Sequence, residues 1–153
     1  MGNRGLVIFK DQDIGVYLHW NGGRDSVYPF LEYCRMKGYR TDDYAPARFC
    51  QVVGNFFGGT LHLGVWCVKG DSLESLNQGD GGIYIVENWD IVGRYPENIQ
   101  EQNSYDPVDF LIGLDEKQPE TERLGEAFIR EYMKKKAEKE GGEEVDGNGK
   151  DPD

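Results

Sequence analysis

The first stretch of the chain alternates apolar and polar residues, which predicts a β-hairpin. Residues 6–10 suit a short strand, residues 11–13 form a polar turn, and residues 14–21 alternate strictly. A period of two residues is typical of a strand with two unlike faces. One face of this strand is apolar, and the other carries Tyr17 and His19.

After a double glycine the apolar spacing changes to three and four residues, which predicts two helices. We expect the first to begin at Asp25 or Ser26, both favourable N-cap residues, and to end at Gly38. The second should follow a cap at Asp42 or Asp43. Its apolar stripe comprises Ala45, Phe49, Val52, Val53 and Phe56.

Three further strands complete the predicted sheet. Residues 60–68 alternate again, residues 69–82 have the composition of a loop, and residues 83–94 suit two strands around a tight turn. We therefore expect an α+β fold: an antiparallel sheet of about five strands, two helices inserted after the second strand, and a C-terminal helix.

The pattern divides the chain into four parts. Residues 1–95 are expected to be the globular α+β domain, and residues 96–119 an extended arm that docks on it. Residues 120–140 are expected to form an amphipathic helix, whose apolar stripe includes Phe128. The acidic residues 141–153 contain no core-forming side chains, which predicts a disordered tail.

The charge of this 153-residue chain is unevenly spread. The net charge is −11, but residues 1–95 carry nine Lys and Arg against eleven Asp and Glu. Residues 96–153 carry eight against seventeen. A near-neutral body argues against binding of duplex nucleic acid, which needs a basic face. The acidic residues are too concentrated on one helix and a tail to make a rigid mimic of nucleic acid.

The cysteine pattern and the lack of long apolar runs indicate a cytoplasmic protein. The chain has three cysteines, an odd number, and no CxxC spacing: Cys34, Cys50 and Cys67. This pattern favours reduced thiols over disulfides. No apolar run approaches the roughly 20 residues of a membrane span. We expect no membrane partner and a cytoplasmic location.

The strand-to-helix junction is the first candidate binding site. His19, Trp20 and Asn21 end a strand, Gly22 and Gly23 follow, and Arg24 precedes the helix. Glycines before a helix N-terminus expose backbone N–H groups that favour anions, and the guanidinium of Arg24 suits phosphate. The alternative is a plain Gly-Gly turn with a packed tryptophan and a surface arginine.

A polar row on the second predicted helix is the next candidate. Arg48, Gln51 and Asn55 lie off the apolar stripe, and such groups bind planar polar ligands through directed hydrogen bonds. The alternative is a solvated helix face. Trp89 could stack on a base and Arg94 could bind a phosphate, although core packing is the competing explanation for the aromatic residues.

Catalytic and metal sites have weaker support. His19 and His62 are expected on the same face of the sheet, but a zinc site needs three or four ligands. We therefore expect no metal and no cofactor, and we assign no catalytic residue. A small hydrolase or phosphodiesterase using these histidines as acid and base stays open.

Three stretches together resemble a family of small proteins encoded by phages and prophages of Gram-positive, gut-type bacteria. They are VYLHWNGG, ARFCQVVGNFFGGTLHLGV and IYIVENWDIVGR, within about residues 4–94. The resemblance stops before the arm, the last helix and the tail, and it assigns no role to any single residue. It implies a phage accessory gene, of the kind that acts against host defences or redirects host enzymes, and therefore a location in the cytoplasm of a bacterial host cell.

The leading hypothesis is a non-enzymatic phage protein that sequesters a nucleotide-like signal molecule and so counteracts antiviral defence. The second is a protein–protein inhibitor of a host enzyme that binds through the arm, last helix and tail. A homodimer through Phe128 and Tyr132 on the last helix is also compatible with the pattern.

Overall fold

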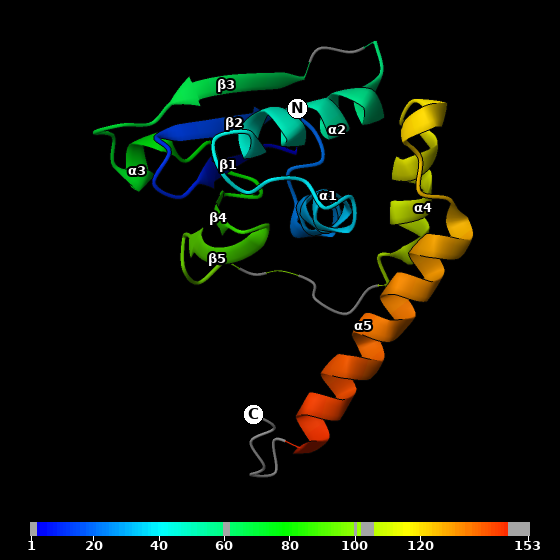
Figure 1. Ribbon diagram of the computed structural model, residues 1–153. Coiled ribbons are helices and arrows are strands. Elements are labelled where there is room, and N and C mark those ends of the chain that lie inside the picture. The colour runs from blue at the N-terminus through cyan, green and yellow to red at the C-terminus, as the bar shows by residue number, and fades with distance from the viewer. Residues whose placement is uncertain (1–2, 60–61, 100, 102–105, 147–153) are drawn as a thin grey trace.

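A computed structural model gives the structure of the protein over residues 3–59, 62–99, 101 and 106–146 (Figure 1). The strands are β1 (Gly5–Phe9), β2 (Ile14–Leu18), β3 (Leu63–Cys67), β4 (Ile83–Glu87) and β5 (Asp90–Tyr95). The helices are α1 (Arg24–Met36), α2 (Ala45–Phe57), α3 (Leu73–Leu76), α4 (Val108–Glu116) and α5 (Glu126–Asp146), with a 3₁₀ turn at Glu120–Glu122.

The five strands form one sheet in the order β3-β2-β1-β4-β5. The predicted α+β class is confirmed, as are the five strands, the two helices after the second strand and the C-terminal helix. All neighbouring strands are antiparallel except β1 and β4, which run parallel. Strand β3 pairs with the second edge of β2, so β4 pairs with the remaining edge of β1. Because β4 runs parallel to β1, the sheet is mixed.

Helices α1, α2, α4 and α5 are arranged in two layers on one face of the sheet. Side chains such as Val7, Val16 and Tyr84 point from the sheet into a core shared with α1 and α2. Helices α4 and α5 lie beyond α1, on the side away from the sheet (Figure 1). The opposite face carries a smaller apolar cluster, which includes Leu6 of β1 and Leu76 of α3.

A helix replaces the extended arm expected over residues 96–119. Helix α4 buries Leu111 and Leu114 completely, and it packs against α1. The two leucines lie three residues apart, on one face of a helical turn. The arm residues 100 and 102–105 lie outside the described part of the chain.

Helix α5 starts later and ends later than the predicted residues 120–140. The chain first makes a 3₁₀ turn, and α5 begins at Glu126 and continues to Asp146, into the expected tail. Residues 147–153 of that tail lie outside the described residues. Ile129 of α5 is fully buried, so the last helix contributes to the main core.

A buried carboxylate fixes the connection between α4 and α5. Asp115 accepts hydrogen bonds from the backbone N–H of Leu124 at 2.8 Å and of Gly125 at 2.9 Å. The hydroxyl of Tyr33 on α1 donates to the same carboxylate. Burial and this hydrogen bond raise the pKa of Tyr33. Helices α1, α4 and α5 are thus joined at one point.

Candidate functional site

The double glycine of the strand-to-helix junction lies where three segments of backbone touch. The N–H of Gly22 donates to the carbonyl of Asn3 at 2.7 Å, and its carbonyl accepts from the hydroxyl of Tyr84 at 2.7 Å. A Cβ added to Gly22 would overlap the backbone of Arg4, and one added to Gly81 would overlap the carbonyl of Gly22. Close packing therefore explains this glycine without a ligand.

The neighbours of Gly22 begin helix α1. Asn21 has a positive φ of 60°, and its side-chain amide donates to the hydroxyl of Ser26 at 3.0 Å. Gly23 is the N-cap, and its carbonyl accepts from the N–H groups of Ser26 and Val27. The alternative explanation of a structural turn therefore accounts for Asn21 and Gly23.

Trp89 and Arg94 also have roles within the fold. Trp89 is buried, and its indole N–H donates to the carbonyl of Tyr39 at 3.0 Å. The guanidinium of Arg94 lies 3.7 Å from the ring centroid of Tyr84 and forms an ion pair with Glu101 at 2.7 Å. Neither side chain is free to stack on or bind a ligand without breaking these contacts.

The polar row on α2 divides between two surroundings. The guanidinium of Arg48 lies 5.3 Å from the ring centroid of Tyr44, and Gln51 is exposed. The amide of Asn55 donates to Gln118 at 2.8 Å, and Gln118 is itself buried. Asn55 therefore links α2 to the segment that follows α4.

His19, Trp20 and His62 form a cluster of rings, which we call the histidine cluster. The rings of His19 and His62 lie 6.0 Å apart, so the expectation that they share one face of the sheet is confirmed. The hydroxyl of Tyr17 lies 2.8 Å from Nδ1 of His19. Trp20 packs edge-on against both histidines and is 39% exposed.

Arg24, one of the predicted site residues, lies in a cleft between α1 and α5. This α1–α5 cleft has a volume of about 640 Å³ and is lined by Arg24, Tyr28, Glu101, Pro107, Met133, Lys136, Ala137 and Glu140. Arg24 lies 3.9 Å from the carboxylate of Glu101, and its guanidinium carbon lies 5.2 Å from the ring centroid of Tyr28. The cleft thus joins two cations, two carboxylates, an aromatic ring and an apolar wall.

Arg24 and Arg48 do not share a site. Arg24 is the first residue of α1, whereas Arg48 approaches Tyr39, which follows the end of that helix. A helix of 13 residues is about 20 Å long at 1.5 Å per residue. The two arginines therefore lie near opposite ends of α1, and the structure does not bring together the residues grouped from the sequence.

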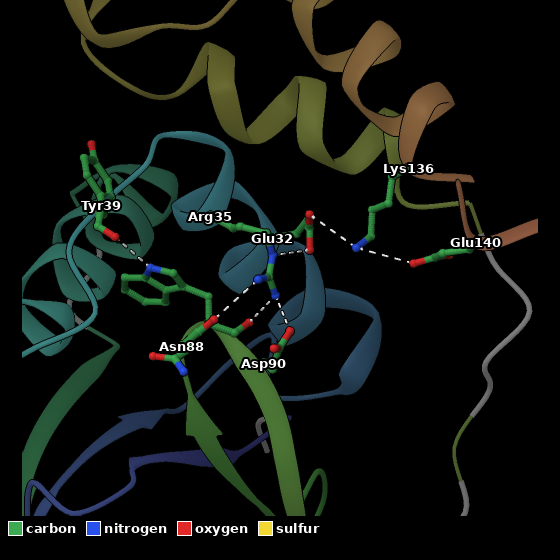
Figure 2. Close-up of polar contacts among 8 residues, drawn as sticks. Glu32, Arg35, Tyr39, Asn88, Asp90, Lys136 and Glu140 are labelled. Carbon is green, nitrogen blue, oxygen red and sulfur yellow. Dashed lines mark hydrogen bonds and ion pairs between the residues drawn. The ribbon is translucent and has the colours of Figure 1, made fainter. Parts of the chain in front are cut away.

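A buried acid of α1 lies between the core and the lysine of the cleft (Figure 2). Glu32 is only 1% exposed, and Arg35 lies 3.2 Å from its Oε1. Lys136 of α5 lies 3.8 Å from its Oε2 and 3.4 Å from Glu140. Burial, followed by the charge of Glu32, raises the pKa of Tyr28 to about 12.

A second hollow of about 370 Å³ shares two residues with the cleft. Lys136 and Glu140 line both, and Arg35, Asp90, Tyr132 and Lys139 complete the second. Arg35 reaches the turn between β4 and β5, where it pairs with Asp90 and donates to the carbonyl of Trp89 at 3.1 Å (Figure 2). Lys136 is therefore central to the polar surface between α1 and α5.

The contribution of α5 to this cleft was not predicted from the sequence. Lys136 belongs to a lysine run that also suits the negative end of a helix dipole. A signal did exist on α1, where Arg24, Tyr28, Glu32 and Arg35 repeat at spacings of three and four residues. Such a row marks one side of a helix, and α5 approaches that side.

The described helices include none that is long and apolar enough to cross a membrane. Within the same residues, no group of three or more His, Cys, Asp or Glu side chains could hold a metal ion. Comparisons with protein families, with curated proteins and with solved structures gave no match.

Proposed function

We propose that this protein is a non-enzymatic binding protein that captures a nucleotide-like small molecule in the α1–α5 cleft. The observation that carries the proposal is the grouping of Arg24, Tyr28 and Lys136 around a volume of about 640 Å³. Clefts that hold small molecules typically measure about 300–1,000 Å³. Of these three residues, Arg24 was predicted from the sequence, whereas Tyr28 and Lys136 were not.

The lining chemistry matches the two halves of a nucleotide. The guanidinium of Arg24 can donate two parallel hydrogen bonds to a phosphate, and Lys136 adds a second positive charge. Tyr28, Met133 and Ala137 offer an aromatic and apolar surface for a base.

A phosphate must displace the carboxylates that pair with these cations in the free protein. Glu101 lies 3.9 Å from Arg24, and Glu140 lies 3.4 Å from Lys136. Glu140 is exposed, and exposed ion pairs contribute only about 0–1 kcal/mol. A phosphate of charge near −2 can replace Glu140 at little cost, because it attracts both cations at once, whereas Glu101 keeps its ion pair with Arg94 at 2.7 Å.

The resemblance to phage-encoded proteins gives this capture a biological setting. A phage accessory protein that binds a nucleotide signal lowers the free concentration of that signal in the infected cell. Host defences that depend on the signal are then weakened without any chemical conversion. Binding alone is sufficient for this role, and the chemistry of the lining residues supports binding.

A thermal-shift screen with nucleotides, cyclic dinucleotides and ADP-ribose derivatives tests the proposal. We expect one compound to raise Tm, since a ligand at a hundredfold excess over Kd stabilises by about 2.7 kcal/mol. The compound should be recovered intact after the protein is denatured. Arg24→Gln should remove the shift, whereas Arg48→Gln should keep it, because Arg48 lies outside the cleft.

A shift that survives Arg24→Gln but is lost with Arg48→Gln would move the ligand to α2. Loss of the compound on recovery would indicate an enzyme. No shift with any compound would contradict the proposal and favour the inhibitor hypothesis.

One observation on α5 favours that second function. Phe128 is 47% exposed and stacks on Tyr132, with the ring centroids 6.3 Å apart. Exposed aromatic pairs are typical anchors of protein interfaces. Phe128→Ser should then abolish binding of a host protein in a comparison of wild type and variant, without affecting the α1–α5 cleft.

A further inference from the structure

The two edges of the sheet are protected very differently. The edge strand β5 carries Asp90 and Arg94, has an irregular register against Ile85 and Val86, and is followed by Pro96. Charges, irregular pairing and proline are the usual means of preventing an edge from pairing with another chain. The other edge strand, β3, has the sequence LGVWC and contains none of these features.

The register of β3 shows which backbone groups point outward. The N–H of His19 donates to the carbonyl of His62 at 2.9 Å, and the N–H of Val68 donates to that of Asp13 at 3.0 Å. Hydrogen-bonded pairs alternate along an antiparallel ladder. The backbone groups of residues 62, 64, 66 and 68 therefore face β2, and those of the intervening residues face away from the sheet.

The outward residues are Leu63, Val65 and Cys67. Within the described part of the chain, no hydrogen bond joins their outward N–H and carbonyl groups to another segment. Figure 1 shows β3 as the outermost strand, with no described helix or strand beyond it. The side chain of Val65 is 61% exposed, more than any other large hydrophobic side chain described, and Cys67 is also exposed.

We propose that β3 pairs with β3 of a second copy of this chain, antiparallel and about a two-fold axis at Val65. In this register Val65 lies opposite Val65, and Leu63 of each copy lies opposite Cys67 of the other. The outward N–H and carbonyl groups of these residues then satisfy one another. The two sheets become one continuous sheet across the dimer, with β3 at its centre.

Self-complementarity and charge identify a second copy as the partner. A two-fold contact must place the same surface on both sides, and an uncharged strand with valine at its midpoint meets that condition. The body of each copy, residues 1–95, carries nine Lys and Arg against eleven Asp and Glu, so two copies can approach at this edge with little repulsion. The β3 edge lets them meet without placing like charges opposite each other.

The mass of the protein in solution tests the pairing. Sedimentation velocity or light scattering should give twice the chain mass of 17.4 kDa for the wild type. Val65→Lys should give the mass of one chain, because it places two ammonium groups opposite each other. Val92→Lys is the matched control: Val92 is 52% exposed on the edge strand β5, and its variant should remain a dimer.

Crosslinking tests the register itself. Residues that form a hydrogen-bonded antiparallel pair have Cα atoms about 5.5 Å apart, and a disulfide requires about 4.4–6.8 Å. The double variant Val65→Cys/Cys67→Ser should therefore form a disulfide-linked dimer on mild oxidation. The wild type should not, because Cys67 lies opposite Leu63.

Three outcomes would overturn the proposal. They are a wild type of single-chain mass at all concentrations, a Val65→Lys variant that remains dimeric, and a dimer that does not crosslink through Val65→Cys. If the Val65→Lys variant remains dimeric and the Phe128→Ser variant dissociates, the dimer interface lies on α5. Circular dichroism of each variant confirms that the fold is retained.

Discussion

The ammonium group of Lys136 on the last helix lies 3.8 Å from a buried carboxylate oxygen of Glu32 on the first. Arg35 holds the other oxygen of Glu32, so the acid has two cationic neighbours and almost no contact with water. The position of α5 thus depends on an ion pair whose acidic member cannot turn outward. The same lysine lines the α1–α5 cleft, which couples the docking of α5 to the proposed ligand site.

Lys136→Met should lower the free energy of unfolding by about 1–3 kcal/mol, because Oε2 of Glu32 then loses its neighbouring positive charge. Lys135→Met is the control. Lys135 is largely exposed and, among the residues that the structure describes, pairs with Glu131 in the same helix, so the change should be within about 0.5 kcal/mol. Urea denaturation of both variants measures the difference, and equal effects would contradict a docking role for Lys136.

Gly22→Ala should prevent stable folding or lower Tm strongly, because the new methyl group would overlap the backbone of Arg4 and Gly5. Gly113→Ala provides the contrast. Gly113 lies within α4 and a Cβ there meets no atom within 4 Å, so this variant should gain about 0.5–1 kcal/mol of stability. A tolerated Gly22→Ala would show that the junction has more room than the structure gives it.

Tyr28 should make stability sensitive to alkaline pH. Its pKa rises from the ordinary value of 10 to about 12 on folding, first because of burial and then because of Glu32. The unfolded chain therefore loses this proton at lower pH than the folded chain does. The stabilisation is fully present below pH 10 and is lost as pH rises towards about 12.

Tyr28→Phe removes this ionisation, so its stability should fall less than that of the wild type between pH 9 and pH 11. Other buried tyrosines, such as Tyr33 and Tyr84, also have raised pKa values and are common to both proteins. The difference between the two urea titrations therefore isolates Tyr28. Parallel pH profiles would contradict its burial beside Glu32.

His19→Gln/His62→Gln tests the remaining enzymatic hypothesis. The two rings meet beside Tyr17 and Phe57, whereas the α1–α5 cleft is lined by other residues. We expect the double variant to keep the thermal shift of any ligand and to return that ligand intact. If the wild type consumes the compound and the double variant does not, the histidines carry a reaction and the binding proposal is wrong.

Local patterns in the sequence predicted the elements of the body well, because each pattern reports the two faces of one strand or helix. The alternation around Val16 and the stripe through Phe49 are of this kind, and both residues are buried in the main core. The region around Leu111 was missed because its apolar run is short and lies in a polar segment. Its helical form depends on packing against α1.

Contacts between distant segments account for what the sequence did not reveal about the site. Whether Arg24 faces solvent or a cleft depends on α5, which is far along the chain. The role of Gly22 depends on the backbone of Gly81 in the same way. Deletion of residues 96–153 would therefore not test binding cleanly, since it removes Leu111 and Ile129 from the core.

The contact of Gly5, Gly22 and Gly81 has a consequence for how this sequence can diverge. Each glycine is confined by backbone atoms, which cannot move aside as a flexible side chain can. Substitutions at these positions cannot be rescued one at a time, because the obstacle belongs to another part of the main chain. Homologues that have lost all other similarity should still carry glycine at these three separated points.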